Sequence, residues 1–271
     1  LSAMGIDLEN TILIIDEAHN LPDRIRNGLE RRAILRVFRD ARDEIDEFLG
    51  TKERVMKKLD LSENQDNFDI RGINETLRQM KKIFKHMNIW YKKKQSDLIK
   101  LGKKDMKIPT IEFIGEIDSI LNEDLDAKID NKYTMLRKMI KQLYRVKVEQ
   151  DEEEDEKETA STRLADILSI SLEYLHNPAL VLVFDLLGDE GRVRSFLLDP
   201  GVVSGPILAS TSGAILMSGT LFPPEMYSDL LQIPENKRIL MKEYESPFLG
   251  DKRPVLVCLL YTSPSPRDVE E

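Results

Sequence analysis

The sequence predicts an α/β protein in which a long helical block interrupts a domain that contains strands. Three observations support this fold class. A short apolar run, 12–15, ends directly in two carboxylates. Apolar residues then recur at helical spacing from about residue 25 to residue 175. From residue 180 onward the pattern changes to short β-rich runs, so we expect strands on both sides of the helical block.

The composition bounds the class of protein. The 271 residues leave room for one large or two modest domains, and 41% hydrophobic residues can form a core. The net charge of −9 does not favour nucleic-acid binding, although it averages very uneven segments. No apolar run approaches the length of a membrane span, and no signal peptide is visible. The single cysteine, Cys258, excludes a disulfide framework within the chain, and we expect a cytoplasmic protein.

The first element is the run I-L-I-I over residues 12–15, which is typical of a fully buried strand. Asp16 and Glu17 follow it, and His19 stands two residues later. Ligands of parallel α/β sheets bind beyond the carboxyl ends of the strands. In nucleotide triphosphatases a strand-end Asp holds Mg²⁺ and a nearby polar residue orients the attacking water. We therefore expect Asp16 to hold Mg²⁺, Glu17 to activate water and His19 to couple the site to its surroundings. The alternative is a plain strand followed by an acidic helix start, with His19 as a polar cap.

Helices are expected next. The first begins after Pro22, carries apolar residues at multiples of four and stops at Gly50. The second covers about residues 74–101 and is interrupted by Pro109. Shorter helices are expected around residues 114–121, 125–146 and 161–175. Residues 149–158 form an almost unbroken acidic run, which we expect to be a solvated loop.

Strands return after Asn177-Pro178. The runs 180–187 and 193–198 flank Gly188 to Gly191, which is a hairpin signal. Residues 214–217 form another short apolar strand that ends in Ser218-Gly219-Thr220. Pro223 and Pro224 then open a helix.

The segment from Lys81 to Lys107 holds ten lysines and two acids, which gives a local charge of +8. Trp90 and Tyr91 lie within it. Lysines interleaved with aromatic residues can follow a phosphate backbone and stack on bases. The candidate DNA-binding residues are Lys92, Lys93, Lys94, Lys103, Lys104 and Trp90. The alternative is a solvated helix face whose aromatic residues pack into the core, because Tyr91 falls on the apolar stripe.

The C-terminal residues 258–271 are similar to the translation of a sequencing adapter. They follow a plausible strand over residues 254–257 and have no apolar period of their own. We expect them to be an artefact of a gene fragment, and the alternative is a natural Pro/Ser-rich tail.

Three segments resemble the XPD-type superfamily 2 DNA helicases, which carry an iron–sulfur cluster. The run from Asp16 to Asn20 resembles helicase motif II, and residues 216–223, L-M-S-G-T-L-F-P, resemble motif III. Residues 245–248, E-S-P-F, resemble the entry to the second motor domain. The resemblance covers essentially residues 1–257. The S-G-T-L form favours the XPD type over the related DinG-type helicases.

The resemblance implies a partial RecA-like P-loop motor domain with a large, mainly helical Arch insertion. The implied domains are motor domain 1 over 1–28 and 179–222, the Arch over 29–178 and the start of motor domain 2 over 223–257. Asp16, Glu17, Ser218, Gly219 and Thr220 would bind Mg-ATP, with Ser218 and Thr220 relaying the state of the γ-phosphate to DNA. The alternative for these hydroxyls is capping of a strand-to-helix turn.

The same resemblance implies ATP-driven 5′-to-3′ movement on single-stranded DNA, including forks and bubbles. It implies a monomer, repair proteins as partners, and DNA repair as the process. The phosphate-binding loop and the four cysteines of a 4Fe-4S cluster are expected before residue 1. The isolated chain is therefore expected to be inactive. Two other readings stay open: a non-catalytic helical module that binds DNA or a partner, and a DinG-type helicase.

Overall fold

The computed structural model describes residues 7–59, 70–122, 133–146 and 158–245. The chain divides into two compact units, residues 1–234 and 235–271. In the second unit, the described residues 235–245 form turns and extended chain, with Lys242 Nζ 4.6 Å from the ring centroid of Tyr244.

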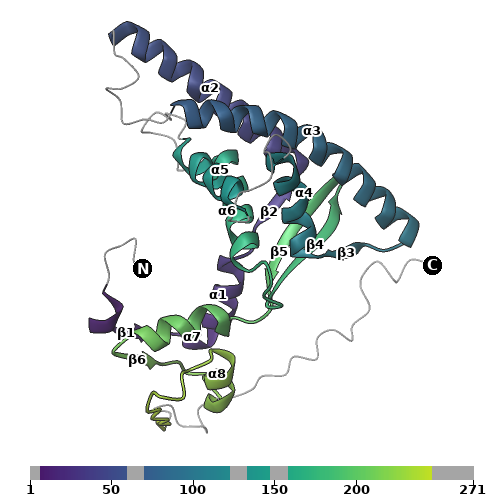
Figure 1. Cartoon of the computed structure of the whole chain (residues 1–271). Helices are drawn as coiled ribbons and strands as arrows, with labels where there is room; N and C mark the ends of the chain where they lie inside the picture. Colours follow the sequence, from purple (N-terminus) through teal and green to yellow (C-terminus); the bar gives the residue numbers. More distant parts are fainter. Residues whose placement is uncertain (1–6, 60–69, 123–132, 147–157, 246–271) are drawn as a thin grey trace, which may run out of the picture. The chain divides into compact units, whose positions relative to one another are not determined.

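A parallel pair of strands joins the two ends of the first unit (Figure 1). Strand β1 (Ile12–Ile15) pairs with β6 (Gly213–Leu216), in a register that places Ile12 opposite Gly213 and Ile15 opposite Leu216. A 3-10 helix, η2 (Leu8–Asn10), precedes β1, and Ser212 N donates to Thr11 O at the start of the pair. The parallel pair fits the expected α/β class.

The prediction that residues 12–15 form a fully buried strand is wrong for this structure. The side chains of Ile12 and Ile14 are 62% and 66% exposed. Within the described residues the sheet of β1 and β6 has two strands only, and both of these side chains stay open to solvent.

A second, antiparallel sheet has the strand order β2-β5-β4-β3 (Figure 1). Its centre is a hairpin of β4 (Leu180–Leu187) and β5 (Glu190–Leu197), turned at Gly188, where φ is +61°. The hairpin agrees with the sequence prediction. Its edges are two short strands that the sequence did not predict, β2 (Arg32–Ile34) and β3 (Asp105–Ile108).

The antiparallel sheet contains strands from both sides of the expected domain boundary at residue 178, and this boundary stays a prediction. Strands β4 and β5 pair with β2 and β3, which lie inside the helical block, and not with β1 or β6. The segment inserted between β1 and β6 therefore contains a sheet of its own, and the chain returns to the β1–β6 sheet through α7 (Gly201–Ser210). Sequence periodicity did not predict α7, because its apolar residues are spread around the helix and Pro206 lies inside it.

The helices of the insertion are long. They are α2 (Leu35–Leu59), α3 (Ile70–Leu101), α4 (Thr110–Asn122), α5 (Thr134–Arg145) and α6 (Ala160–Glu173). Three of them, α3, α4 and α6, agree with the expected positions to within about four residues, and α5 agrees at its end. The predicted single helix from Pro22 to Gly50 is wrong, since the chain forms α1 (Leu21–Gly28), then β2, then α2. Helix α2 also continues through Gly50.

One hydrophobic core unites the helices with one face of the antiparallel sheet. Phe38 of α2, Trp90 and Tyr91 of α3, Phe113 of α4 and Phe184 of β4 are all buried in it. Their rings meet mainly edge to face, with the centroids of Trp90 and Tyr91 5.3 Å apart. Tyr91 also donates its hydroxyl to Ala33 O at 2.8 Å, which fixes α3 to β2.

Several sequence predictions fall outside the described residues. These are most of the acidic run 149–158, the start of the fourth helix near residue 125, the segment 246–248, the strand 254–257 and the tail 258–271. Helix α8 (Pro224–Leu230) begins where Pro223 and Pro224 predicted a helix.

Candidate functional site

The carboxyl ends of β1 and β6 lie side by side, and this position brings together two loops that are 200 residues apart in the sequence. Met217 N donates to Ile15 O at 3.0 Å, and Ala18 N donates to Met217 O at 3.0 Å. These two hydrogen bonds continue the parallel pairing beyond the strands. Asp16 to His19 and Ser218 to Thr220 are therefore neighbours in space.

Glu17 has a left-handed backbone conformation, with φ +49° and ψ +42°. A residue with a side chain at positive φ is unfavourable, and such conformations gather at functional sites. The turn begins where the backbone N–H of Glu17 donates to the Asp16 carboxylate, with N and Oδ1 2.8 Å apart. It continues into the 3-10 helix η3 (Ala18–Asn20), which packs the fully buried Ala18 inward. The result is that Asp16 and Glu17 both project into solvent beyond the strand.

Glu17, His19 and Ser218 form a triangle of polar contacts. His19 Nδ1 lies 2.7 Å from Ser218 Oγ and 3.1 Å from Glu17 Oε2. Ser218 Oγ donates to Glu17 Oε2 at 3.3 Å and accepts from Thr220 N at 3.1 Å. The side chain of His19 is 32% exposed and that of Glu17 is 63% exposed. The triangle holds one oxygen of Glu17 and leaves the rest of this carboxylate open to a ligand.

Of the expected ATP-site residues, the structure brings Asp16, Glu17, His19, Ser218 and Thr220 to this edge of the sheet. Gly219 lies between the two hydroxyl residues and is exposed. Ser218 Oγ and Thr220 Oγ1 are 3.4 Å apart. The capping alternative is partly met, because Thr220 N does bind the Ser218 hydroxyl, but that hydroxyl contacts His19 and Glu17 as well.

The donor set at this edge suits Mg²⁺ in one respect. Mg²⁺ takes one or two protein carboxylates and completes its shell with water and substrate phosphates. Asp16 is an exposed carboxylate at a strand end, which is such a ligand. Among the described residues, no group of three or more His, Cys, Asp or Glu side chains gathers to hold a metal without a substrate. The chain has one cysteine, so its own residues do not provide the four thiolates of a 4Fe-4S cluster.

The structure separates the candidate DNA-binding residues into two groups. Lys92, Lys93, Lys103 and Lys104 are exposed. Trp90 is only 4% exposed and packs between Phe113 and Phe184, so base stacking by Trp90 is excluded in this structure. Lys94 is also withdrawn from solvent, because it pairs with Glu112 and its Nζ lies 5.5 Å from the ring centroid of Trp90.

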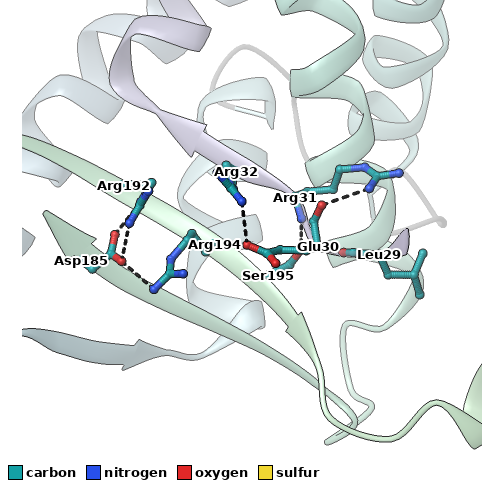
Figure 2. Close-up of polar contacts among 8 residues, drawn as sticks. All are labelled: Leu29, Glu30, Arg31, Arg32, Asp185, Arg192, Arg194 and Ser195. Atoms are coloured by element: carbon teal, nitrogen blue, oxygen red, sulfur yellow. Dashed lines mark hydrogen bonds and ion pairs between the residues drawn. The ribbon is translucent and has the colours of Figure 1, made fainter. Parts of the chain in front are cut away.

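Sequence reasoning missed a polar cluster on the other face of the antiparallel sheet (Figure 2). Asp185 of β4 accepts two hydrogen bonds from Arg192 of β5, both 2.8 Å long, and forms an ion pair with Arg194 at 2.7 Å. Burial raises the pKa of Asp185. The hydrogen bonds and positive charges of the two arginines lower this pKa by more than burial raises it, so the net shift is downward. The cluster exists because the register of the hairpin places Asp185 opposite Arg192. The sequence alone does not give this register.

The same view shows how the chain enters and leaves the insertion (Figure 2). Arg31 N donates to Ser195 Oγ at 2.8 Å, Ser195 N donates to Arg31 O at 2.9 Å, and Ser195 Oγ donates to Leu29 O at 2.9 Å. The Arg31 side chain then reaches Asp166 of α6 at 3.1 Å. The entering and leaving segments are thus joined to each other and to the helical block.

The comparisons with known proteins give one informative relative. No family model matches the chain. The chain is similar to the ATP-dependent DNA helicase CHL1 of Meyerozyma guilliermondii, with 24% identity over 227 residues, which cover 83% of this chain and 25% of that helicase. The chain thus spans about a quarter of the length of this relative. The similarity supports the helicase superfamily expected from the two motifs. The XPD type, the Arch and the direction of movement stay predictions.

No helix in the described residues is long and apolar enough to cross a membrane.

Proposed function

We propose that this chain is part of an ATP-dependent DNA helicase of the XPD type, which couples hydrolysis of Mg-ATP to 5′-to-3′ movement along single-stranded DNA. The observation that carries the proposal is the triangle of Glu17, His19 and Ser218, because it links the end of β1 to the end of β6. Similarity to a relative named as an ATP-dependent DNA helicase supports the same substrate class. A role in DNA repair, on forks or bubbles and with repair partners, is part of this proposal.

Each residue of the site has a defined task in the proposal. Asp16 would hold Mg²⁺, which when bound neutralises charge on the phosphates of ATP. Glu17 orients the attacking water and accepts its proton, since a carboxylate oxygen remains open to solvent. His19 and Ser218 are positioning residues: they fix the other oxygen of Glu17, so that a shift of the β6 loop changes the direction of the carboxylate. This contact is a physical route from ATP to the rest of the molecule.

The insertion would serve as the Arch that guides single-stranded DNA. It has its own core and its own sheet. In the sequence it begins after α1 and ends before α7, and these two helices connect it to the parallel pair of β1 and β6. Inserted elements that emerge from strand ends often carry function. Residues 223–257 would begin the second motor domain.

The first test is to read the gene on both sides of this segment and then to assay the longer protein. The proposal requires G-x-x-x-x-G-K-[ST] upstream. In the longer protein, Glu17→Gln should lower DNA-stimulated ATP hydrolysis by about 10²- to 10⁴-fold with little change in KM for ATP. Glu9→Gln, which removes an exposed carboxylate before β1, is the matched control.

Ser218→Ala tests the positioning role separately. It should lower kcat, leave KM for ATP unchanged and reduce the stimulation by DNA, because the Glu17 carboxylate is no longer held. An upstream sequence without the phosphate loop, or unchanged hydrolysis in Glu17→Gln, would overturn the proposal.

A further inference from the structure

One side of α3 carries a positive surface of exposed lysines. Lys81, Lys85, Lys92, Lys93 and Lys100 are exposed on the side of the helix opposite the buried Ile83, Met87, Trp90, Tyr91 and Leu98. At 3.6 residues per turn these five lysines fall within one outward sector of the helix. We call this set the lysine face.

Neighbouring acids do not neutralise the lysine face. Between residues 81 and 101 the helix has one acid, Asp97. The nearby carboxylates of α4 are engaged elsewhere, since Glu112 pairs with Lys94 and Glu116 lies 2.6 Å from His86 Nε2. Both pairs lie on the side of α3 that faces α4. No described carboxylate forms an ion pair with the lysines of the lysine face, so its charge stays available in a chain of net charge −9.

The positive surface continues past the end of the helix. Gly102, at φ +61°, ends α3, and the exposed Lys103, Lys104 and Lys107 follow into β3. Lysines in a last helical turn are favoured by the helix dipole, which accounts for Lys100 without any ligand. The dipole does not account for Lys81 to Lys93, because its effect is confined to the last turn.

The chemistry of the lysine face selects phosphate and not base. The segment from Lys81 to Lys107 contains no arginine for bidentate recognition of guanine. Of its two side-chain amides, Gln95 donates to Asp189 O at 3.2 Å and Asn88 is only partly exposed. Of its aromatic residues on α3, Trp90 and Tyr91 are 4% and 3% exposed, and Phe84 packs against the core with Arg42 Cζ 5.2 Å from its ring centroid. What remains outside is a row of flexible point charges along about 30 Å of helix.

We propose that the lysine face, with Lys103, Lys104 and Lys107, binds the phosphate backbone of DNA without contacting its bases. The choice of DNA over another polyanion rests on the proposed function. The exposed Ile89 and Ile99, at 63% and 65%, interrupt the lysines and are the features that an acidic helix of a protein partner would use. Charge outweighs them, because isolated exposed aliphatic residues are ordinary on protein surfaces.

The test measures binding of the full chain to oligothymidine, oligodeoxyadenosine and duplex DNA by fluorescence anisotropy at several salt concentrations. Lys92→Gln with Lys93→Gln should raise Kd about tenfold at low salt and reduce the magnitude of the log–log salt slope by about 1.4 on single strands. Lys92→Arg with Lys93→Arg should bind as the wild type does. The matched control is Lys138→Gln with Lys141→Gln, two exposed lysines of α5 with the same change in charge.

Three results would overturn the proposal. The first is equal weakening by the α5 control, which would mean binding by net charge alone. The second is quenching of the single tryptophan, Trp90, on addition of oligothymidine, or a marked preference between the two homopolymers, because either would mean base contact. The third is binding of polyglutamate but not DNA, which would identify an acidic protein as the partner. If the longer protein does not hydrolyse ATP but the chain still binds DNA in a salt-dependent way, the helicase proposal is refuted. The proposal that the lysine face binds the phosphate backbone is then unaffected.

Discussion

Glu44 of α2 caps the first turn of α6 from a different helix. Its carboxylate accepts from Ala160 N at 2.8 Å, from Ser161 N at 2.7 Å and from Ser161 Oγ at 2.7 Å. Ala160 and Ser161 are 1% and 0% exposed, so water does not replace these acceptors easily. Glu44→Ala leaves two buried amide donors without partners at a helix start where negative charge is favourable.

The magnitude follows from these contacts. A net hydrogen bond to a charged group contributes about 1.5–3 kcal/mol, and such contributions do not add fully. Glu44 is itself partly exposed, and Thr159 still caps Thr162 N at 3.2 Å, so we expect Glu44→Ala to lower the free energy of unfolding by about 2–4 kcal/mol. Glu44→Gln should cost less, because the amide keeps one acceptor oxygen.

The assay is chemical unfolding of the chain, followed by circular dichroism and by Trp90 fluorescence. Glu47→Gln on the exposed side of α2 is the control, since it removes the same charge from the same helix. If Glu44→Ala unfolds at the same denaturant concentration as Glu47→Gln, cross-helix capping of α6 does not stabilise the fold and the reasoning fails.

Two further predictions concern the sheet and α7. The folded pKa of Asp185 is lowered, so its stabilisation is present above its unfolded pKa of about 3.9 and is lost as pH falls through the lower folded value. Asp185→Asn should therefore cost about 2–3 kcal/mol near neutral pH and progressively less below pH of about 4, whereas Asp105→Asn, at an exposed position opposite it in β3, should show no such profile. In α7, a Cβ on Gly201 would lie 2.4 Å from Gln232 Cγ, so Gly201→Ala should destabilise by about 1–3 kcal/mol. Gln232→Ala should relieve part of that loss in a double-mutant cycle, and Gly115→Ala, where the added atom meets nothing within 4 Å, should not destabilise.

The sequence predicted the elements whose signals are local. The stripe of α3 and the turn at Gly188 repeat or cluster within a few residues, and the structure has the helix and the hairpin close to where they were expected. The edge strands β2 and β3 were missed because strands of three or four residues, in which three of the seven residues are charged, are too short to show an alternating apolar pattern. Each forms only because β5 or β4 offers hydrogen bonds from far along the chain.

The candidate site divides in the same way. Asp16 and Glu17 could be singled out from their place after an apolar run, but the left-handed conformation of Glu17 and its contact with Ser218 depend on the pairing of β1 with β6. Trp90 shows the opposite error. Its place among lysines suggested stacking on DNA, whereas the helix turns its ring toward Phe113 and Phe184. The distribution of charge along the sequence does not show on which side of the helix a residue lies. The side of α3 that packs against the core decides whether a side chain is buried or exposed.

The burial of Trp90 is also the reason why the lysines stay outside. The rings of Trp90 and Tyr91 hold α3 against the sheet at Phe184, and this contact fixes the rotation of the helix about its own axis. With that rotation fixed, Lys92 and Lys93 point away from the core, whereas Lys94 points toward Glu112. A substitution such as Trp90→Ala would loosen the rotation and so weaken the positive surface without removing any lysine. Packing of the core and the outward direction of the lysine face are therefore properties of the same few side chains.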